Sequence, residues 1–203
     1  MLRLFYAPHS CALASRIALN DAGADYELVT VDLSKGEQRS PDYLRINPKA
    51  RVPALVTDRG ILAETPAILA FIAQSFPDSG LAPLDDAFAF AQMQAFNAYL
   101  ASTVHVNHAH GRRGYRWADE QSSFEDMKRK VPQTMAESCA LIEEQLAEGP
   151  WVMGERYTVA DPYLFTVSGW LRGDGVDIDR FPRVKAHREA MQARDSVRRA
   201  LAD

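Results

Sequence analysis

The sequence predicts an α/β domain followed by an all-α helical bundle, and three observations predict this division. Strand and helix signals alternate over residues 1–77. Residues 78–86 contain a proline, a glycine and three aspartates, which is typical of a linker between domains. Over residues 87–203 the strand signal disappears and apolar residues recur at helical spacing, as expected for a helical bundle.

The first domain is expected to follow the order β-α-β-α-β-β-α, a compact α/β unit. The apolar residues 2–6 predict its first strand, and the amphipathic residues 11–22 predict a helix that ends near Gly23. The β-rich residues 26–31 predict the second strand, and "SPDYLRIN" predicts a brief helical turn.

A hairpin and a helix complete this domain. In "VPALVTDRGILAE" two short strands flank Asp58-Arg59-Gly60, where glycine allows the positive φ that a tight turn needs. In "TPAILAFIAQSF" a helix is expected to begin with Thr65 as its cap and Pro66 in its first turn. The helices predicted for the second domain cover residues 87–110, 120–147, 158–171 and 183–193, with a last short helix to residue 201.

Composition and charge argue against several classes of function. The net charge is −4 and neither half of the chain is basic, so no nucleic-acid or membrane partner is expected. The apolar segment at residues 2–6 is too short for the core of a signal peptide, and no apolar run approaches the roughly 20 residues of a membrane-spanning helix. Two widely spaced cysteines predict neither a disulfide framework nor a zinc site, so the cytoplasm is the expected location.

Cys11 is the first candidate for chemistry, because it lies between the loop "APHS" and a predicted helix. The unpaired N–H groups and partial positive charge at a helix N-terminus are expected to lower the pKa of a thiol there, and the thiolate is the reactive form. The plainer interpretation of Cys11 is a small buried apolar residue. No second cysteine stands three residues further on, so Cys11 is not part of a dithiol oxidoreductase motif.

The segments "NPKARVPAL" and "ETPAI" are two further candidates. A cis bond between Val52 and Pro53 would present the backbone N–H and C=O of Val52 to an extended peptide, whereas a trans proline would simply lie in a loop. Glu64 and Thr65 at a helix start could hold the ammonium and the carboxylate of a ligand, but ordinary helix capping also explains both residues. Each of these signals is weak when taken alone.

Three motifs taken together resemble the glutathione-binding half of cytosolic glutathione transferases, and the bacterial beta class is the closest match. In order along the chain they are a cysteine after "YAPHS", then "NPKARVPAL", then "ETPAI". In the second half, "TVADPYLF" resembles the capping-box helix start of that superfamily, with Thr158 as the cap and Asp161 answering three residues further on. The resemblance implies a thioredoxin-like first domain, a helical second domain, a homodimer and glutathione bound between the two domains.

The resemblance also implies which residues carry the chemistry. Cys11 is expected near the glutathione sulfur, with the hydroxyl groups of Tyr6 and Ser10 beside it. His105 falls where the class has a histidine in its long first bundle helix, and is expected to approach the sulfur from the helical domain. Where the class usually has a lysine after that histidine, Val106 stands here, which removes a cation from the neighbourhood of the thiol.

A second group of residues is expected to bind the tripeptide. Lys35 is expected to hold the glycine carboxylate, and Val52 to pair with the peptide backbone, next to the cis Pro53. Glu64 and Thr65 are expected to hold the γ-glutamyl end. The chain departs from the class at positions 9 and 50, where it has histidine and alanine in place of a common glycine.

The helical half offers two weaker signals. The histidines at positions 105, 108 and 110 suggest a metal site, but no carboxylate or cysteine at ligand spacing completes a set, so no metal is expected. Tyr115, Trp117 and Trp170 are candidates to line a pocket for a second substrate, although aromatic residues at helical spacing are more often part of a core.

The function implied by the resemblance is that of a glutathione transferase, which activates the glutathione thiol for attack on an electrophilic carbon, a disulfide or a peroxide. In conjugation, Cys11 would donate a hydrogen bond to the bound thiolate. In thiol exchange, Cys11 would form a mixed disulfide with glutathione. The alternatives are a non-catalytic glutathione-fold module that carries a ligand or binds a partner, and a monothiol reductase, which the helical half argues against.

Overall fold

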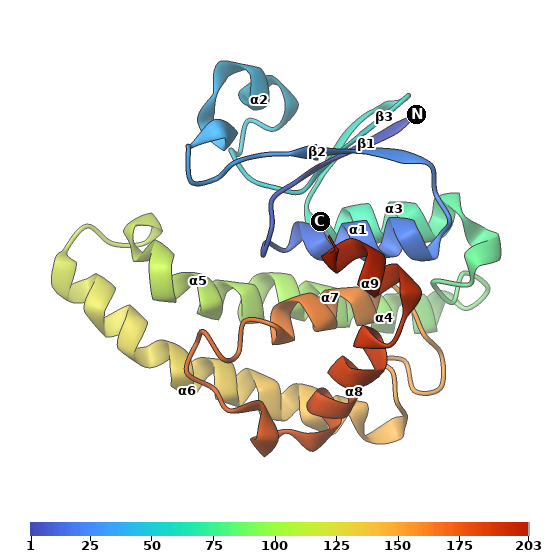
Figure 1. Cartoon of the computed structure of the whole chain (residues 1–203). Coiled ribbons are helices and arrows are strands. Elements are labelled where there is room, and N and C mark those ends of the chain that lie inside the picture. Colours follow the sequence, from blue (N-terminus) through green and yellow to red (C-terminus); the bar gives the residue numbers. More distant parts are fainter. Residues whose placement is uncertain (203) are drawn as a thin grey trace.

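A computed structural model describes residues 1–202 of the chain, and Asp203, the last residue of the predicted helical domain, lies outside the described residues. In Figure 1 the strands form an upper layer, α1 and α3 lie beneath them, and α4 to α8 lie lower still, whereas α9 reaches the level of α1. The elements of the first half are β1 (Leu2–Tyr6), α1 (Ala12–Asp21), β2 (Tyr26–Thr30), α2 (Pro41–Ile46), β3 (Ala54–Thr57), β4 (Gly60–Ala63) and α3 (Thr65–Ser75). Those of the second half are α4 (Ala87–Tyr99), α5 (His105–Arg113), α6 (Gln121–Gln145), α7 (Ala160–Ser168), α8 (Pro182–Gln192) and α9 (Asp195–Leu201). The predicted fold class is confirmed.

The four strands form one mixed sheet in the order β2-β1-β3-β4. β1 runs parallel to β2, with Leu4 opposite Leu28, and antiparallel to β3, with Leu4 opposite Leu55. The parallel pair needs a crossover connection, which α1 supplies, whereas β3 and β4 form the predicted hairpin around Asp58 and Arg59. Leu4 and Leu55 are fully buried in the centre of the sheet.

The start of α3 differs by one residue from the prediction. Glu64 is the N-cap, and Thr65 is the first residue of the helix. The N–H of Ile68 donates to the Glu64 carbonyl oxygen at 3.0 Å, which is the first bond of the helix. The prediction that Thr65 caps α3 is therefore wrong. Pro66 lies in the first turn as expected, where its missing N–H costs no hydrogen bond.

The predicted helix over residues 87–110 contains one wider turn. α4 ends at Tyr99, a π-helical turn spans Leu100–Val104, and α5 begins at His105. A π turn holds one more residue than an α turn, so the residues that follow it are rotated by about 100° around the helix axis. Periodicity therefore predicts the length of this helix but not which face of α5 meets the first half of the chain.

The reciprocal hydrogen bonds that the sequence predicts are formed at the start of α7, but the N-cap is Val159, one residue after the predicted cap Thr158. The Thr158 hydroxyl accepts from the N–H of Ala160 at 3.3 Å, and Asp161 accepts from the N–H of Thr158 at 2.7 Å. Asp161 also accepts from the N–H of Val152 at 2.8 Å, and its other contact is the Nε2 atom of His187 at 3.1 Å. Because Asp161 is fully buried, this network ties α7 to the preceding loop and to α8.

The two halves share one hydrophobic core. α1 packs against α7 and α9, and a single cluster of buried residues contains Leu4 and Ile68 from the first half and Met93 and Leu164 from the second. The predicted limits of the domains, 1–77 and 87–203 with a linker over 78–86, stay a prediction. Within residues 1–202, no helix combines the length and the apolar character needed to cross a membrane.

Candidate functional site

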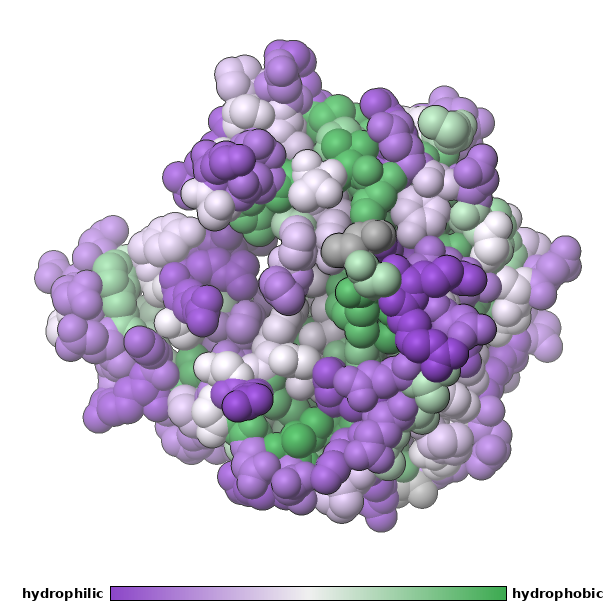
Figure 2. All heavy atoms as spheres, in the orientation of Figure 1, coloured by the Kyte–Doolittle hydropathy of each residue, from purple (hydrophilic) through white to green (hydrophobic). Residues whose placement is uncertain are grey.

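A cavity of about 440 Å³ lies between the first half of the chain and α5. Figure 2 shows the surface hollowed between the part that carries α2 and the end of α5, with hydrophilic residues beside the hollow. Two of the predicted site residues, Tyr6 and Lys35, do not line this cavity. The predicted residues that do line it are Ser10, Cys11, Val52, Pro53, Glu64, Thr65 and His105.

Cys11 is the N-cap residue of α1, and its thiol donates a hydrogen bond to the carbonyl oxygen of Val52 at 3.5 Å. Burial raises the pKa of this thiol, and its effect exceeds the lowering by the hydrogen bond with Thr65 and by the charge of Arg113. The expectation of a lowered pKa is therefore wrong. Cys11 is only 8% exposed, so the cost of desolvating a thiolate outweighs the favourable field of the helix terminus.

The two hydroxyl groups near Cys11 lie in different surroundings. The Ser10 hydroxyl donates to the carbonyl oxygen of Ala7 at 2.7 Å and accepts from the N–H of Ala12 at 3.2 Å, so it stabilises the first turn of α1. Tyr6 is buried in the core, with the guanidinium carbon of Arg16 5.4 Å from its ring centroid. The predicted role of both hydroxyl groups beside a ligand sulfur stays a prediction.

Val52 and Pro53 form the edge of the cavity beside Cys11. The bond between them is cis, as the sequence analysis expects. Both residues precede β3, which begins at Ala54. Among the described residues, the N–H of Val52 donates to no backbone acceptor. Val52 therefore presents a free donor next to the carbonyl group that Cys11 contacts, which is the arrangement that pairing with an extended peptide needs.

Glu64 and Thr65 bring the start of α3 to the cavity. Thr65 is buried, and its hydroxyl acts to lower the pKa of the Cys11 thiol, although the effect of burial is larger. The Glu64 carboxylate pairs with the ammonium group of Lys49. This arrangement suits a ligand that carries both an ammonium and a carboxylate. The Glu64 carboxylate can accept hydrogen bonds from the ammonium, and the N–H groups at the start of α3 can donate to the carboxylate.

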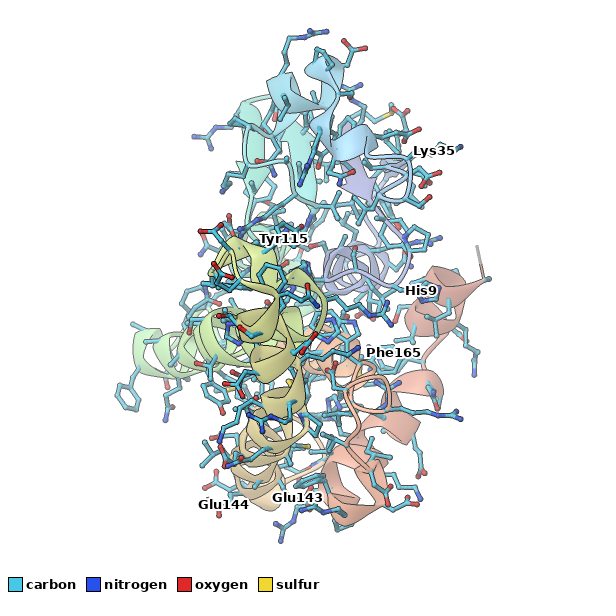
Figure 3. All side chains as sticks on the ribbon, turned by 90° about the vertical axis from the view of Figure 1, so that its left-hand side faces the viewer. His9, Lys35, Tyr115, Glu143, Glu144 and Phe165 are labelled. Atoms are coloured by element: carbon cyan, nitrogen blue, oxygen red, sulfur yellow. The ribbon has the colours of Figure 1, made fainter. Side chains whose placement is uncertain are left out.

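Lys35 lies outside the cavity. Its side chain is 75% exposed, and its ammonium group pairs with Asp32 at 3.3 Å. Figure 3 shows Lys35 at the outer edge of the upper layer, whereas Tyr115 lies where the two layers meet. The residues of this loop region that line the cavity are Leu33 and Gln38. The role of Lys35 toward a glycine carboxylate stays a prediction.

His105 lines the cavity from the helical side, and its imidazole lies 4.9 Å from the ring of Trp170. Burial lowers the pKa of His105 to about 3, and the positive charge of Arg113 contributes to this shift. The imidazole is therefore neutral at physiological pH. It can accept or donate a hydrogen bond there, but it supplies no positive charge to an anion.

The positive charge of the cavity comes from arginines that the sequence analysis misses. Arg112 and Arg113 lie seven and eight residues after His105, which places all three on one face of α5. That spacing is the signal that could have identified them. The arginines that line the cavity are Arg51, Arg112, Arg113 and Arg116.

Arg113 supplies a cation that the sequence analysis takes to be missing. Val106 also lines the cavity, so the class lysine at that position has no counterpart there. The charge of Arg113, two turns further along α5, nevertheless lowers the pKa of Cys11. An anion beside Cys11 would therefore lie in the field of this guanidinium.

The three aromatic candidates of the helical half, Tyr115, Trp117 and Trp170, all line the cavity. Tyr115 is 53% exposed and Trp117 is 46% exposed, so both are accessible at the surface of the molecule. Trp170 is held more firmly, because the ring of His108 stacks on it at a centroid distance of 4.3 Å. The Nδ1 atom of His108 in turn lies 2.8 Å from a carboxylate oxygen of Asp174, a partner that the sequence does not reveal.

The described non-glycine residues with a positive φ all lie close to this cavity. His9, Ala50 and Glu64 have φ values of 59°, 52° and 73°. Ala50 and Glu64 line the cavity, and His9 precedes Cys11 by two residues. Residues other than glycine adopt this conformation at a cost, which explains physically why glycine is common at positions 9 and 50 of the class. Such strain is typical of functional sites.

The fold and the cavity together define a class of protein: a thioredoxin-like domain joined to a helical domain, with a thiol-lined site for an extended peptide between them. Comparison with family models identifies the family. Residues 1–74 match the N-terminal domain of glutathione S-transferase, and residues 117–190 match its C-terminal domain. Together these matches cover more than half of the chain, which belongs to the glutathione S-transferase family.

Individual relatives agree with this assignment over nearly the whole chain. The crystal structure of a glutathione transferase homolog from Sulfitobacter with bound glutathione is 48% identical, with a TM-score of 0.94, over 98% of this chain and 96% of that one. A bacterial beta class glutathione S-transferase from Sphingomonas chungbukensis is 31% identical, with a TM-score of 0.86, over 98% and 97% of the two chains. Glutathione S-transferase GstA of Escherichia coli O157:H7 is 34% identical over 98% of this chain and 97% of its own.

Proposed function

We propose that this glutathione transferase binds glutathione in the cavity beside Cys11 and activates its thiol for attack on an electrophilic carbon. The observation that carries this proposal is a convergence of groups on one cavity. The free N–H of Val52, the thiol of Cys11 and the Glu64 carboxylate come from the first half of the chain. His105 and Arg113 come from α5.

The tripeptide fits this arrangement in one direction. Its γ-glutamyl end carries an ammonium and a carboxylate, which suit Glu64 and the N-terminus of α3 at Thr65. Its backbone would pair with Val52 as an added strand. The sulfur of the central residue would then lie beside Cys11, and the glycine carboxylate would lie at the far end from Glu64. Arg51 is the cavity-lining cation of the first half, which supports a role for it at that carboxylate.

The chemistry needs the bound sulfur as an anion. Lowering a thiol pKa from about 8.5 to about 6.5 raises the thiolate fraction at pH 7 more than tenfold. The neutral Cys11 thiol can donate a hydrogen bond to that anion, and Arg113 adds a favourable charge. The thiolate lone pair then forms the carbon–sulfur bond, and the leaving group departs with the bonding electron pair.

The raised pKa of Cys11 favours conjugation over thiol exchange. Exchange through a mixed disulfide would need Cys11 as a thiolate, and burial opposes that state. Exchange remains the second candidate, because the cavity brings a protein thiol close to the expected position of the ligand sulfur. A non-catalytic ligand carrier is less well supported, since Arg113 provides the cation whose absence at Val106 suggested it.

Calorimetry and a conjugation assay test the proposal together. Wild-type protein should take up glutathione at millimolar concentration and conjugate it to 1-chloro-2,4-dinitrobenzene. Glu64→Gln should weaken glutathione binding about tenfold, because it removes the charge that faces the ligand ammonium. The control Glu125→Gln, which changes an exposed residue of α6, should bind glutathione like the wild type. Absence of any binding heat with glutathione would overturn the proposal.

Two further properties belong to the same proposal. We expect a homodimer, as the resemblance implies, and the exposed apolar residues Phe88 on α4 and Ile61 on β4 are consistent with a contact surface. Light scattering on a sizing column tests this expectation, and a monomer mass would contradict it. We also expect the protein in the cytoplasm, since both of its cysteines are free thiols.

A further inference from the structure

The cavity carries an excess of positive charge that the protein does not neutralise. Its charged lining consists of one acidic residue, Glu64, and the four arginines 51, 112, 113 and 116. Glu64 pairs with Lys49 and with none of these arginines. Within residues 1–202, none of the four guanidinium groups forms an ion pair.

This clustering is unfavourable without a ligand. The chain as a whole has a net charge of −4, so the four arginines oppose its overall balance. They are also close enough to act on one another, since burial lowers the pKa of Arg113 most and the charges of Arg116 and Arg51 lower it further. Unpaired like charges that converge on one cavity are typical of a site that binds an anion.

Glutathione itself accounts for only part of this charge. Its γ-glutamyl carboxylate meets the N-terminus of α3, and its ammonium meets Glu64. Its glycine carboxylate needs one cation, for which Arg51 on the first half is placed. Its thiolate needs another, and Arg113 is the arginine whose charge acts on Cys11. Arg112 and Arg116 are then left without a role toward the tripeptide.

These two arginines lie beside an apolar surface. Tyr115 and Trp117 flank Arg116 in sequence, line the same cavity and are each about half exposed. Figure 3 shows Tyr115 at the level where the two layers of the molecule meet. A ligand here would have planar aromatic rings for its apolar part and planar guanidinium groups for its charge. Guanidinium groups bind carboxylates with two parallel hydrogen bonds.

We propose that the second substrate is an organic electrophile with a carboxylate group, which Arg112 and Arg116 bind while Tyr115 and Trp117 cover its apolar part. This inference rests on the proposed function and names the class of substrate for the same site. The carboxylate of the electrophile is held by the outer arginines, and its reactive carbon is presented to the glutathione sulfur beside Cys11. A neutral electrophile of the same shape would leave the two arginines unpaired.

A matched pair of substrates tests this inference. Glutathione displaces chloride from 4-chloro-3-nitrobenzoate and from the neutral 4-chloro-3-nitrobenzamide by the same reaction, in which a carbon–sulfur bond forms and chloride leaves with the bonding pair. Each kcat/KM is divided by the rate constant of the uncatalysed reaction, which removes the difference in intrinsic reactivity. We expect the wild type to prefer the carboxylate about tenfold or more by this ratio.

The variant Arg112→Gln/Arg116→Gln should lower this preference to about threefold or less, because the amide side chains retain hydrogen bonding without charge. Arg129→Gln is the matched control, since it removes an exposed arginine of α6 that does not line the cavity, and it should keep the wild-type preference. A wild-type preference below twofold, or a preference that survives in the double variant, would overturn the inference.

A binding measurement separates failure of the inference from failure of the proposed function. The unreactive 3-nitrobenzoate is titrated into protein loaded with glutathione, with 3-nitrobenzamide as the neutral comparison. The Kd for nitrobenzoate should rise at least about fivefold in the double variant. Turnover of both aryl chloride substrates without a preference for the carboxylate would contradict only the inference. If neither compound is turned over although 1-chloro-2,4-dinitrobenzene is, the inference fails. If 1-chloro-2,4-dinitrobenzene is not conjugated either, the proposed function fails, and the titration still decides whether the cavity selects a carboxylate.

Discussion

The Sγ atom of Cys11 lies 3.5 Å from the carbonyl oxygen of Val52, the residue whose N–H is free to pair with a ligand. One residue therefore anchors the protein thiol and offers the edge for the tripeptide. A peptide that pairs with Val52 is placed beside Cys11, whose single S–H would turn from the Val52 carbonyl oxygen toward the bound sulfur. In this position Cys11 is a hydrogen-bond donor, and its burial keeps it protonated.

The first prediction concerns the reactivity of Cys11. Because burial raises its pKa, the thiolate fraction at pH 7 is small and grows only as the pH rises above the range of an ordinary thiol, about 8.5. Alkylation of Cys11 by iodoacetamide should therefore be slower at pH 7 than that of free cysteine, and should accelerate up to pH 9.5. Peptide mass spectrometry identifies the modified residue, with Cys139→Ala as the control. Rapid alkylation of Cys11 at pH 7 would show that burial does not keep this thiol protonated.

The second prediction concerns Cys11 in the complex. If it donates to the bound thiolate, Cys11→Ala should raise the kinetic pKa of glutathione by about one unit, from about 6.5 to about 7.5, which lowers kcat/KM about fivefold at pH 6.5. The loss should shrink toward pH 9, where glutathione is ionised in either protein. The kinetic pKa of glutathione in Cys11→Ser, which keeps a hydrogen-bond donor, should lie between the values for the wild type and for Cys11→Ala. If Cys11→Ala instead abolishes disulfide reduction and leaves conjugation unchanged at every pH, thiol exchange is its role.

The third prediction concerns the pH dependence of stability. The pKa of His105 is about 3 in the folded protein and about 6.5 in the unfolded protein. Between these values the unfolded state binds a proton that the folded state does not bind, so the free energy of unfolding falls as the pH falls below 6.5. Wild-type protein should lose about 1–2 kcal/mol more unfolding free energy than His105→Gln between pH 7.5 and pH 5. Urea unfolding at the two pH values measures this difference. Parallel losses in the two proteins would show that His105 titrates normally in the fold.

The fourth prediction concerns the buried network at the start of α7. Asp161→Ala leaves the N–H groups of Val152 and Thr158 and the ring of His187 without their acceptor, and should cost about 3 kcal/mol or more of unfolding free energy. Asp126→Ala breaks only an exposed ion pair with Arg129 on α6 and should cost less than about 1 kcal/mol. Similar losses for the two variants would argue against the capping network.

The fifth prediction concerns backbone strain. Ala50 has a φ of 52°, which costs an L-residue about 1–2 kcal/mol, so Ala50→Gly should leave the unfolding free energy unchanged or raise it by up to about 1 kcal/mol. Ala91→Gly makes the same change at an exposed position inside α4 and should lower the unfolding free energy by about 1 kcal/mol. Opposite signs for the two substitutions identify strain at position 50, and equal losses would contradict it.

Much of the fold could be predicted from periodicity and from local hydrogen-bonding residues. Residues 2–6 alternate as a strand should, and Thr158 with Asp161 marks a helix start, because these signals act between near neighbours in the chain. The starting residue of α3 could not be predicted, since nothing in the sequence indicates the positive φ that Glu64 adopts as its N-cap. Nor could the π turn at residues 100–104, because an α-helical period continues through it in the sequence.

The site was predicted less completely than the fold. Val52, Glu64 and Thr65 belong to short motifs, and each motif reaches the cavity as a unit. Lys35 lies in a loop held by local hydrogen bonds to Asp32, and its side chain pairs with Asp32 at the surface. The arginines of α5 were not predicted as site residues, because a run of charged residues on a helix usually faces solvent. Only the first half of the chain, folded opposite α5, makes them the lining of a cavity.

By itself, the sequence determined which segments are strands and helices. It also determined the order along the chain of the thiol of Cys11, the Val52-Pro53 segment and the carboxylate of Glu64 at a helix start. Those features depend on interactions over a few residues. The tertiary structure alone decided the protonation state of Cys11 and the charge of the cavity around it. Cys11 contacts Val52, which is distant in the sequence, and the charge of Arg113 acts on it from more than a hundred positions further along the chain, because electrostatic energies depend on distance in space.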